Sequence, residues 1–203
     1  KKKILVEKPA FQNFSEIKLI KKNYNIKNIF FAEGFMYLHH PQILDLIKVL
    51  KDKKIGNLIS INSKFGKNIL KKKNFLGMEI LKKQNSDNRL FNKSLGGGVI
   101  LDLGCYPVSF CLLIASLYFS VDINTINKKK NRKQMGSTGV EIDASAEINF
   151  NGNFSAVVEA SFLNDIGYKT EIIGNKGKII IEDTWHASSP IQVITNKSEE
   201  IFN

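Results

Sequence analysis

The first part of the chain alternates between short apolar runs and one amphipathic segment. The runs at residues 3–6 and 29–35 are short and rich in apolar side chains, which is typical of buried β-strands. Between them, Asn13 or Ser15 is suited to cap a helix that continues to about residue 23. A strand, a helix and a strand in this order predict a parallel βαβ unit. The expected inward face of the helix consists of Ile17, Leu19 and Ile20.

A second helix and a further strand are predicted next. Apolar residues at helical spacing follow Pro41, and Gly56 lies just past their end, which indicates an amphipathic helix. Residues 58–65 alternate between apolar and polar positions, as in a half-buried strand. Residues 66–94 are polar and irregular, and we expect a loop with one helical turn there. The apolar positions of the helix are Ile43, Leu44, Ile47 and Leu50.

Three glycines at residues 96–98 precede the most apolar stretch of the chain, which we expect to be a helix ending near Tyr118. Glycine lets the backbone turn tightly and lets another segment approach closely. Residues 103–121 carry no charge and are long enough to cross a bilayer, which takes about 20 residues. Because Gly104, Pro107 and three serines interrupt this stretch, a buried core helix is the favoured interpretation and a membrane span the alternative.

From residue 121 onward the pattern changes to short strand-like segments with turn signals between them. Asn151-Gly152 and Asn175-Lys176-Gly177 are hairpin signals, so neighbouring strands are expected to pair antiparallel. The lysine-rich segment at residues 127–139 is interpreted as a loop. The strands are expected at residues 121–126, 143–150, 154–163, 168–173 and 178–182. The whole pattern predicts an α+β fold, with a short parallel α/β beginning and an open, mostly antiparallel sheet that carries helices on one face.

Composition narrows the class of protein. An apolar fraction of 43% supports a packed core. The formal net charge of +11 comes almost wholly from lysine, because Arg89 and Arg132 are the only arginines. Base-reading proteins depend on arginine, so no nucleic-acid partner is expected, and a basic nucleic-acid binder is the less favoured alternative. Cys105 and Cys111 lie in the apolar stretch without a CxxC motif, which predicts reduced thiols, no metal site and a cytoplasmic location.

Three motifs in a fixed order carry a resemblance to a known family. Glu7-Lys8-Pro9 follows a strand, residues 32–37 (Ala-Glu-Gly-Phe-Met-Tyr) precede His40-Pro41, and the glycines at 96–98 run into Asp102-Leu103-Gly104-Cys105-Tyr106. Together they resemble the Gfo/Idh/MocA oxidoreductases, and within them the dihydrodiol dehydrogenase, xylose dehydrogenase and glucose-fructose oxidoreductase branch. The resemblance implies that residues 1–36 are the end of an NAD(P)-binding Rossmann domain. Residues 37–203 would then form the C-terminal substrate and oligomerisation domain.

The resemblance also implies a truncated chain. The glycine-rich phosphate loop of a Rossmann domain is not found in these residues, and Leu101 stands where the glycine run would need its third fingerprint glycine. We therefore expect a fragment of an NAD(P)-dependent dehydrogenase acting on CH-OH groups, which is inactive alone.

The resemblance places Lys8 between the nicotinamide of NAD or NADP and the hydroxyl of the substrate, with Asp102 and Tyr106 completing the catalytic site. Glu7, Lys8 and Pro9 would contact the cofactor. The substrate implied is a sugar, a polyol or a diol. Arg89 is the first candidate for a substrate-binding residue, and His40 is the second.

These residue types suit the removal of a proton from an alcohol. A tyrosine has a pKa of about 10, which is too high for a base near neutrality, and a nearby ammonium lowers it. Lys8 would lower the pKa of Tyr106, which would act as base in oxidation and as acid in reduction. Asp102 would hold Lys8 or hydrogen-bond the substrate, and on a helix it shares a face with Tyr106, four residues on. A cis Lys8–Pro9 bond is expected at such a tight turn.

Each candidate also has a simpler interpretation. Lys8 and Arg89 can be solvated surface residues, Asp102 a helix cap, Tyr106 a core aromatic and His40 a structural residue. Trp185-His186 is assigned no role.

The alternative for the whole chain is a catalytically silent module that uses its open sheet for self-association. Residues 154–163 have apolar side chains on both faces, which suits helices on one side and a second copy on the other. In either case a homodimer or homotetramer is expected.

Overall fold

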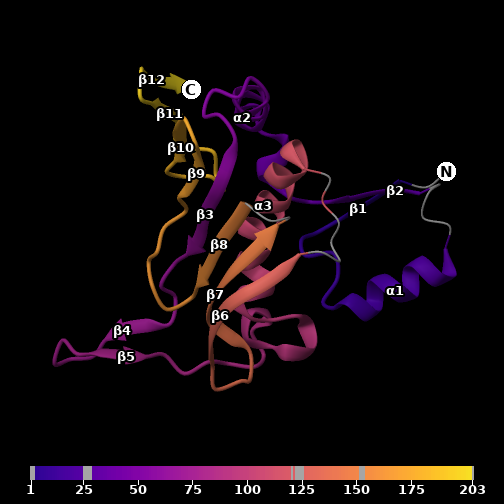
Figure 1. Cartoon of the computed structure of the whole chain (residues 1–203). Helices are drawn as coiled ribbons and strands as arrows, with labels where there is room; N and C mark the ends of the chain where they lie inside the picture. Colours follow the sequence, from indigo (N-terminus) through magenta and orange to yellow (C-terminus); the bar gives the residue numbers. More distant parts are fainter. Residues whose placement is uncertain (1–2, 25–28, 120, 122–125, 151–153, 203) are drawn as a thin grey trace.

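The computed structural model describes residues 3–24, 29–119, 121, 126–150 and 154–202 (Figure 1). One sheet of eight strands runs through the body of the molecule in the order β12-β11-β10-β9-β3-β8-β7-β6. Its neighbouring strands pair antiparallel except for β3 and β8, which are parallel. The strands are β3 (Leu58–Gly66), β6 (Asn127–Met135), β7 (Glu141–Phe150), β8 (Phe154–Ser161), β9 (Thr170–Gly174), β10 (Gly177–Ile181), β11 (Ile191–Thr195) and β12 (Glu199–Phe202).

Two helices, α2 (Pro41–Lys51) and α3 (Cys105–Tyr118), cover one face of this sheet. Leu46 and Leu50 of α2 and Ile114 of α3 pack against strand residues such as Ile61 and Ile172 in one buried cluster. These apolar positions recur at helical spacing, so each helix presents a continuous stripe to the sheet. The predicted α+β class, with helices on one face of a mostly antiparallel sheet, is confirmed.

The helical stretch Lys93–Tyr118 is long and apolar enough to cross a membrane by length and composition. Within it, α3 packs on the sheet and buries Phe110, Cys111, Ile114 and Ala115. The core helix of a soluble protein passes the same test of length and composition, so this finding carries little weight for a membrane span.

The N-terminal unit consists of β1 (Lys3–Val6), α1 (Phe14–Asn23) and β2 (Phe30–Glu33). β1 and β2 pair in parallel as a separate sheet, as the βαβ pattern predicts. Asn13 caps α1, because its side-chain oxygen accepts the amides of Ser15 and Glu16.

The prediction of the inward face of α1 is wrong. Leu19 and Ile20 are exposed and Ile17 is only half-buried. The reason is geometric: a sheet of two strands is too narrow to cover a helix.

The segment predicted as a loop at residues 66–94 has more structure than its pattern indicates. It contains the hairpin β4 (Lys71–Lys73) and β5 (Glu79–Leu81), which projects from the body (Figure 1). The turn between them is closed by Asn74, whose side-chain oxygen accepts the amides of Leu76 and Met78. Two 3₁₀ turns follow, η3 (Arg89–Phe91) and η4 (Lys93–Leu95). Strands of three residues are too short to show a period of two.

The lysine-rich segment predicted as a loop is an edge strand instead. Residues 127–135 form β6, which pairs antiparallel with β7 although all of its residues are exposed. Strand formation here depends on backbone pairing rather than on an apolar face, and lysines are typical of edges protected against aggregation. The strand predicted at residues 121–126 falls mainly outside the described residues.

The strands predicted at β7, β8, β9 and β10 are confirmed, with bounds that differ by at most two residues, and the pairs β7–β8 and β9–β10 are antiparallel. The Asn151-Gly152 turn lies outside the described residues, whereas Asn175 and Lys176 join β9 to β10 as predicted. β11 and β12 were not predicted. The insertion of β3 between β8 and β9 was not predicted either.

Candidate active site

The backbone around Lys8 is fixed by the ends of the two N-terminal strands. The Lys8–Pro9 peptide bond is cis, as predicted. The amide of Ala10 donates to Oε1 of Glu33 at 2.7 Å, and the amide of Gly34 donates to the carbonyl oxygen of Val6 at 2.7 Å. Glu33 belongs to one of the quoted motifs but was given no role. It ties the turn after β1 to the end of β2, at the carboxyl edge where parallel sheets place their functional residues.

The glycine run brings η3 against the helical segment that follows it. The amide of Gly97 donates to Asn92, and the amide of Gly98 donates to Leu90. A Cβ atom at residue 97 would lie 2.7 Å from the carbonyl oxygen of Arg89, so only glycine fits. Gly98 has φ +112°, a conformation that other residues avoid. The glycines therefore permit the close approach that brings the Arg89 side chain to Asp102.

Asp102 lies in a π-helical turn, η5 (Ile100–Gly104), directly before α3. Pro107 is five residues further on, which is the spacing of a π-helical hydrogen bond, but proline has no N–H to donate. The carbonyl oxygen of Asp102 instead accepts a hydrogen bond from Nζ of Lys8 at 2.5 Å. Single π turns inside α-helices are frequent at functional sites, and this one lets the backbone of residue 102 bind a side chain from the N-terminal unit.

Two cationic side chains converge at the carboxylate of Asp102. Its Oδ1 lies 3.5 Å from Nζ of Lys8 and 3.2 Å from a terminal nitrogen of Arg89. The side chains of Lys8 and Asp102 are 17% and 13% exposed, whereas that of Arg89 is 61% exposed. The Lys8–Asp102 pair is thus largely shielded from water, where charge interactions are stronger than at the surface. The structure brings Lys8 to Asp102, as the sequence predicts, and it adds a contact between Arg89 and Asp102 that was not predicted.

Tyr106 completes this cluster, but not in the predicted way. Nζ of Lys8 lies 4.8 Å from the centre of the Tyr106 ring, over the aromatic face, in a cation–π contact. Burial raises the pKa of Tyr106 above its ordinary value, and the nearby Cys105, Asp102 and Glu7 raise it further. The expectation that Lys8 lowers this pKa is therefore wrong, because the ammonium interacts with the ring and burial dominates. Tyr106 is a phenol at neutral pH.

A wall of aromatic rings holds Tyr106. The ring centres of Phe35, Phe65 and Trp185 lie 5.4, 5.2 and 5.7 Å from that of Tyr106. Trp185 is 1% exposed, and its Nε1 donates to the carbonyl oxygen of Lys64 at 2.9 Å. Sequence reasoning gave Trp185 no role, since its partners are distant in the chain. A lone tryptophan after a strand was the only available signal.

His186 and Asp183 extend this wall. The His186 ring lies 6.3 Å from Phe65 and 5.0 Å from Tyr168, and its Nδ1 lies 3.0 Å from Oδ1 of Asp183. Burial opposes the charge of Asp183, but hydrogen bonds from Ser188 and His186 outweigh it and lower its pKa. The carboxylate fixes the orientation of the imidazole beside the aromatic wall.

Two other predicted residues have local roles. His40 is exposed, and its Nδ1 accepts the amide of Gln42, so it caps α2. Within the described part of the chain, no contact joins it to Lys8, Asp102 or Tyr106. Glu7 is exposed and Pro9 half-buried in the turn that positions Lys8.

Among the described residues, we find neither an activated thiol nor a cluster of metal-ligating side chains. Burial raises the pKa of the Cys105 thiol to about 11, although Lys8 opposes this, so the thiol stays protonated at neutral pH. No group of three or more His, Cys, Asp or Glu side chains suited to a metal ion occurs among these residues.

The fold and the cluster around Asp102 define the class of protein. In this class, a lysine that follows the first strand of a parallel βαβ unit contacts the start of a helix in an α+β sheet domain. A family model described as the GFO/IDH/MocA C-terminal domain matches residues 43–180. The chain therefore belongs to the GFO/IDH/MocA family, as the three motifs predict.

Individual relatives agree with this assignment. Trans-1,2-dihydrobenzene-1,2-diol dehydrogenase of Xenopus tropicalis is 28% identical over 203 residues, which is 100% of this chain and 54% of that protein. dTDP-3,4-didehydro-2,6-dideoxy-alpha-D-glucose 3-reductase of Saccharopolyspora spinosa is 24% identical over 89% of this chain and 48% of that protein. The chain thus spans about half the length of the curated relatives it matches.

Solved structures share the fold. KijD10, a 3-ketoreductase from Actinomadura kijaniata in complex with NADP and TDP-benzene, superposes with a TM-score of 0.76 at 18% identity, covering 99% of this chain and 57% of that one. The aldose-aldose oxidoreductase from Caulobacter crescentus, complexed with glycerol, gives a TM-score of 0.76 at 14% identity, covering 100% of this chain and 56% of that one.

Proposed function

We propose that this chain is part of an NAD(P)-dependent oxidoreductase that interconverts a hydroxyl and a carbonyl group on a sugar, polyol or diol. The observation that carries the proposal is the meeting of Lys8, Asp102 and Tyr106 at the carboxyl edge of the N-terminal βαβ unit. Residues 1–36 would be the end of the nucleotide-binding domain, and residues 37–203 the substrate and oligomerisation domain. Relatives named as a diol dehydrogenase and as a sugar 3-reductase support this substrate class.

The described residues suit the proton side of such a reaction. A bound nicotinamide would supply or accept the hydride. Lys8, held by Asp102, would direct its ammonium toward the substrate oxygen and stabilise negative charge there. Tyr106 carries its proton at neutral pH and would act as the acid in the reduction, with its phenolic proton passing to the carbonyl oxygen as hydride reaches the carbon.

Arg89 and the aromatic wall have proposed roles in binding. Arg89 is anchored to Asp102 yet mostly exposed, so its remaining N–H groups are available to a substrate or cofactor oxygen. Phe65 and Tyr168 pack edge to face, with ring centres 5.4 Å apart, and present apolar surface beside Tyr106. Sugars and cyclic diols have apolar C–H faces that pack on such rings.

Self-association is part of this proposal. The sheet face opposite α2 and α3 includes Val157 and Ile201, which are exposed and which pair with Glu147 and Gln192 on neighbouring strands. A second copy covering this face would give the expected homodimer or homotetramer, with or without catalysis. Sedimentation at increasing protein concentration tests this point, and a monomer at all concentrations contradicts it.

The decisive test of the enzyme class has two parts. The coding sequence upstream of Lys1 should encode a strand followed by a glycine fingerprint. In the polypeptide that contains that region, Lys8→Met should lower kcat by about 100- to 10,000-fold while the melting temperature stays similar. Lys22→Met, at an exposed lysine of the same unit, is the matched control and should leave kcat unchanged. Near-normal turnover of Lys8→Met would refute the role of Lys8.

A further inference from the structure

A second concave site lies on the other side of the turn that carries Asp102. It is a pocket of about 430 Å³ between η5, the first turn of α3 and strands β6, β7 and β8. Ile100 and Val108 face it and remain 41% and 36% exposed, so apolar surface is open to solvent there. Its volume falls in the range of small-molecule sites, about 300–1,000 Å³.

The strand register decides which side chains face the pocket. Ala144, Ala146 and Ile148 of β7 lie on the helix-covered face, and Gly104 of η5 lies close to Ala160 of β8 on that face. Together with Val158, these residues form an apolar floor.

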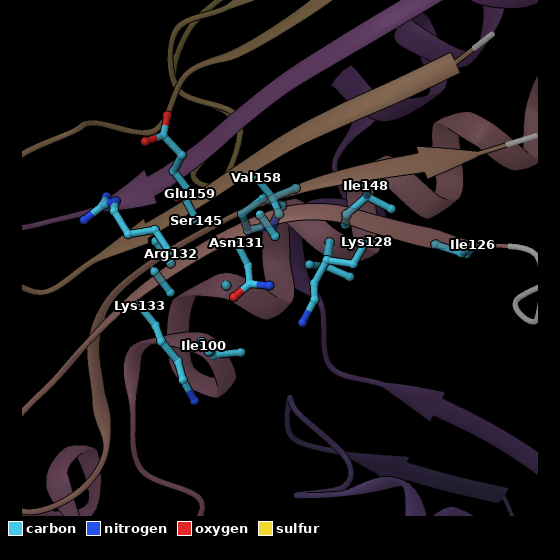
Figure 2. A pocket seen from close by; sticks show the side chains of 16 residues that line it. Ile100, Ile126, Lys128, Asn131, Arg132, Lys133, Ser145, Ile148, Val158 and Glu159 are labelled. Atoms are coloured by element: carbon cyan, nitrogen blue, oxygen red, sulfur yellow. The ribbon is translucent and has the colours of Figure 1, made fainter. Parts of the chain in front are cut away.

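The rim of the pocket is cationic. Lys133 pairs with Ala144 and Lys128 with Ile148 in the register, so both lysines lie on the helix-covered face. Figure 2 shows Lys128, Asn131 and Lys133 on the side of Ile100, whereas Arg132 and Glu159 extend to the other side of the strands. The register agrees, because Arg132 and Glu159 both pair with Ser145, on the opposite face.

The acidic residues near the pocket do not neutralise the positive charge of its rim. Arg132 is bound to Asp143 on the far face, and Lys133 contacts Glu141 at 3.4 Å in a half-exposed pair at one end of the rim. An exposed pair of this kind contributes little energy, so Lys133 can still bind an anion. The site thus combines an apolar floor with two ammonium groups and an amide.

The pocket is separate from the candidate active site. Lys8, Arg89, Asp102 and Tyr106 are not among its lining residues. Within η5, Asp102 binds Lys8 on one side of the turn, while Ile100 and Gly104 line the pocket on the other.

We propose that this pocket binds a small amphipathic anion: an aliphatic or aromatic body on the floor formed by β7, β8 and α3, with a carboxylate or phosphate held by Lys128, Asn131 and Lys133. Charge complementarity favours this occupant over a second copy of the chain, which carries a net charge of +11. The proposal does not depend on the oxidoreductase assignment.

The experiment uses displacement of the fluorescent anion 1-anilinonaphthalene-8-sulfonate by sodium decanoate. Decanoate should displace the probe, and octanoate should bind about tenfold more weakly, because two methylene groups fewer are buried. If the site recognises only the negative charge of the head group, decyl phosphate should compete as well as decanoate. Weaker competition by decyl phosphate would show that the site prefers carboxylates. The cation decyltrimethylammonium should not compete.

Variants connect binding to the pocket. Lys128→Ala combined with Lys133→Ala should weaken decanoate by about tenfold or more, because two charge-assisted contacts are lost. Lys130→Ala, on the same strand but facing the opposite side, should leave affinity unchanged. Ala146→Trp should fill the floor and abolish binding without changing the far-UV circular dichroism spectrum of the folded chain.

The proposal is overturned if decanoate binds the lysine variants and the wild type equally, or if the cation competes as well as the anion. It is also overturned if probe binding falls as protein concentration rises, because a second copy would then occupy the pocket. The lysine variants are surface changes, so they decide the question even if Ala146→Trp does not fold.

Discussion

The N-terminal unit and the sheet body differ in how they are held together. In β1, α1 and β2 no residue is fully buried, and apolar side chains such as Leu5, at 73% exposure, face outward. In the body, α2 and α3 bury a continuous core against the eight-stranded sheet. Among the described residues, the body that carries Asp102 and Tyr106 therefore buries most of the apolar surface, whereas the unit that carries Lys8 buries little.

The contacts between the two regions are few and specific. Lys8 binds Asp102 and lies over Tyr106, and Gln12 donates to the carbonyl oxygen of Ser94. Phe35, just after β2, packs against Tyr106. Because most of these contacts lie at the candidate site, substitutions there should affect both the placement of the N-terminal unit and the catalytic reaction.

The largest expected difference concerns core packing. Trp185→Ala should lower the free energy of unfolding by about 3–5 kcal/mol, because a large, buried ring is removed from the aromatic wall. Leu5→Ala, at an exposed position of the N-terminal unit, should change it by less than about 0.5 kcal/mol. Chemical denaturation followed by far-UV circular dichroism measures both. Equal effects would mean that the two regions share one core.

Helix caps sharpen the same comparison. His40→Ala, which removes the cap of α2 in the body, should lower global stability by about 1 kcal/mol. Asn13→Ala removes the equivalent cap of α1, and it should increase amide exchange within α1 while leaving the global midpoint unchanged. Hydrogen exchange read beside denaturation distinguishes the two. A shift of the global midpoint by Asn13→Ala would show that α1 is coupled to the body.

A smaller effect is expected at low pH. The folded state lowers the pKa of Asp183 below 3.8, so this carboxylate stabilises the body above that pH and the contribution is lost as pH falls through the lowered value. Asp183→Asn should therefore reduce stability at pH 7, and the difference from wild type should disappear once the pH falls below the lowered pKa. Melting curves across this range measure the difference. A constant difference at all pH values would exclude the ionised carboxylate as its cause.

The smallest effect is spectroscopic. The difference in ultraviolet absorbance between wild type and Tyr106→Phe should show tyrosinate only above pH 10, because burial raises the pKa of Tyr106. Titration below pH 10 would instead support a phenol activated by Lys8.

Much of the fold could be predicted because its elements have regular periods. The βαβ order, the α2 stripe and the hairpin at Asn175-Lys176 all follow local rules. β6 could not be predicted, since a strand of lysines has no apolar alternation and depends on its pairing with β7. The place of β3 between β8 and β9 is set by packing across the sheet, which leaves no local signal.

The site was predictable in its members but not in its geometry. Motif order identified Lys8, Asp102 and Tyr106, and their meeting is observed. The position of Nζ over the ring, and hence the direction of the pKa shift, depends on three-dimensional placement. Trp185 could be given no role from the sequence, because its ring packs against residues 65 and 106, which are far away in the chain.

The contact between Lys8 and Asp102 joins the two regions at the candidate site, and a double-mutant cycle tests it directly. Amide exchange of residues 3–24 is measured in wild type, Lys8→Met, Asp102→Asn and the double variant. Each single change should lower the opening free energy of this segment by about 1–3 kcal/mol, and the double variant should lose no more than the larger single loss. Fully additive losses, or no loss in either single variant, would show that the two side chains do not interact.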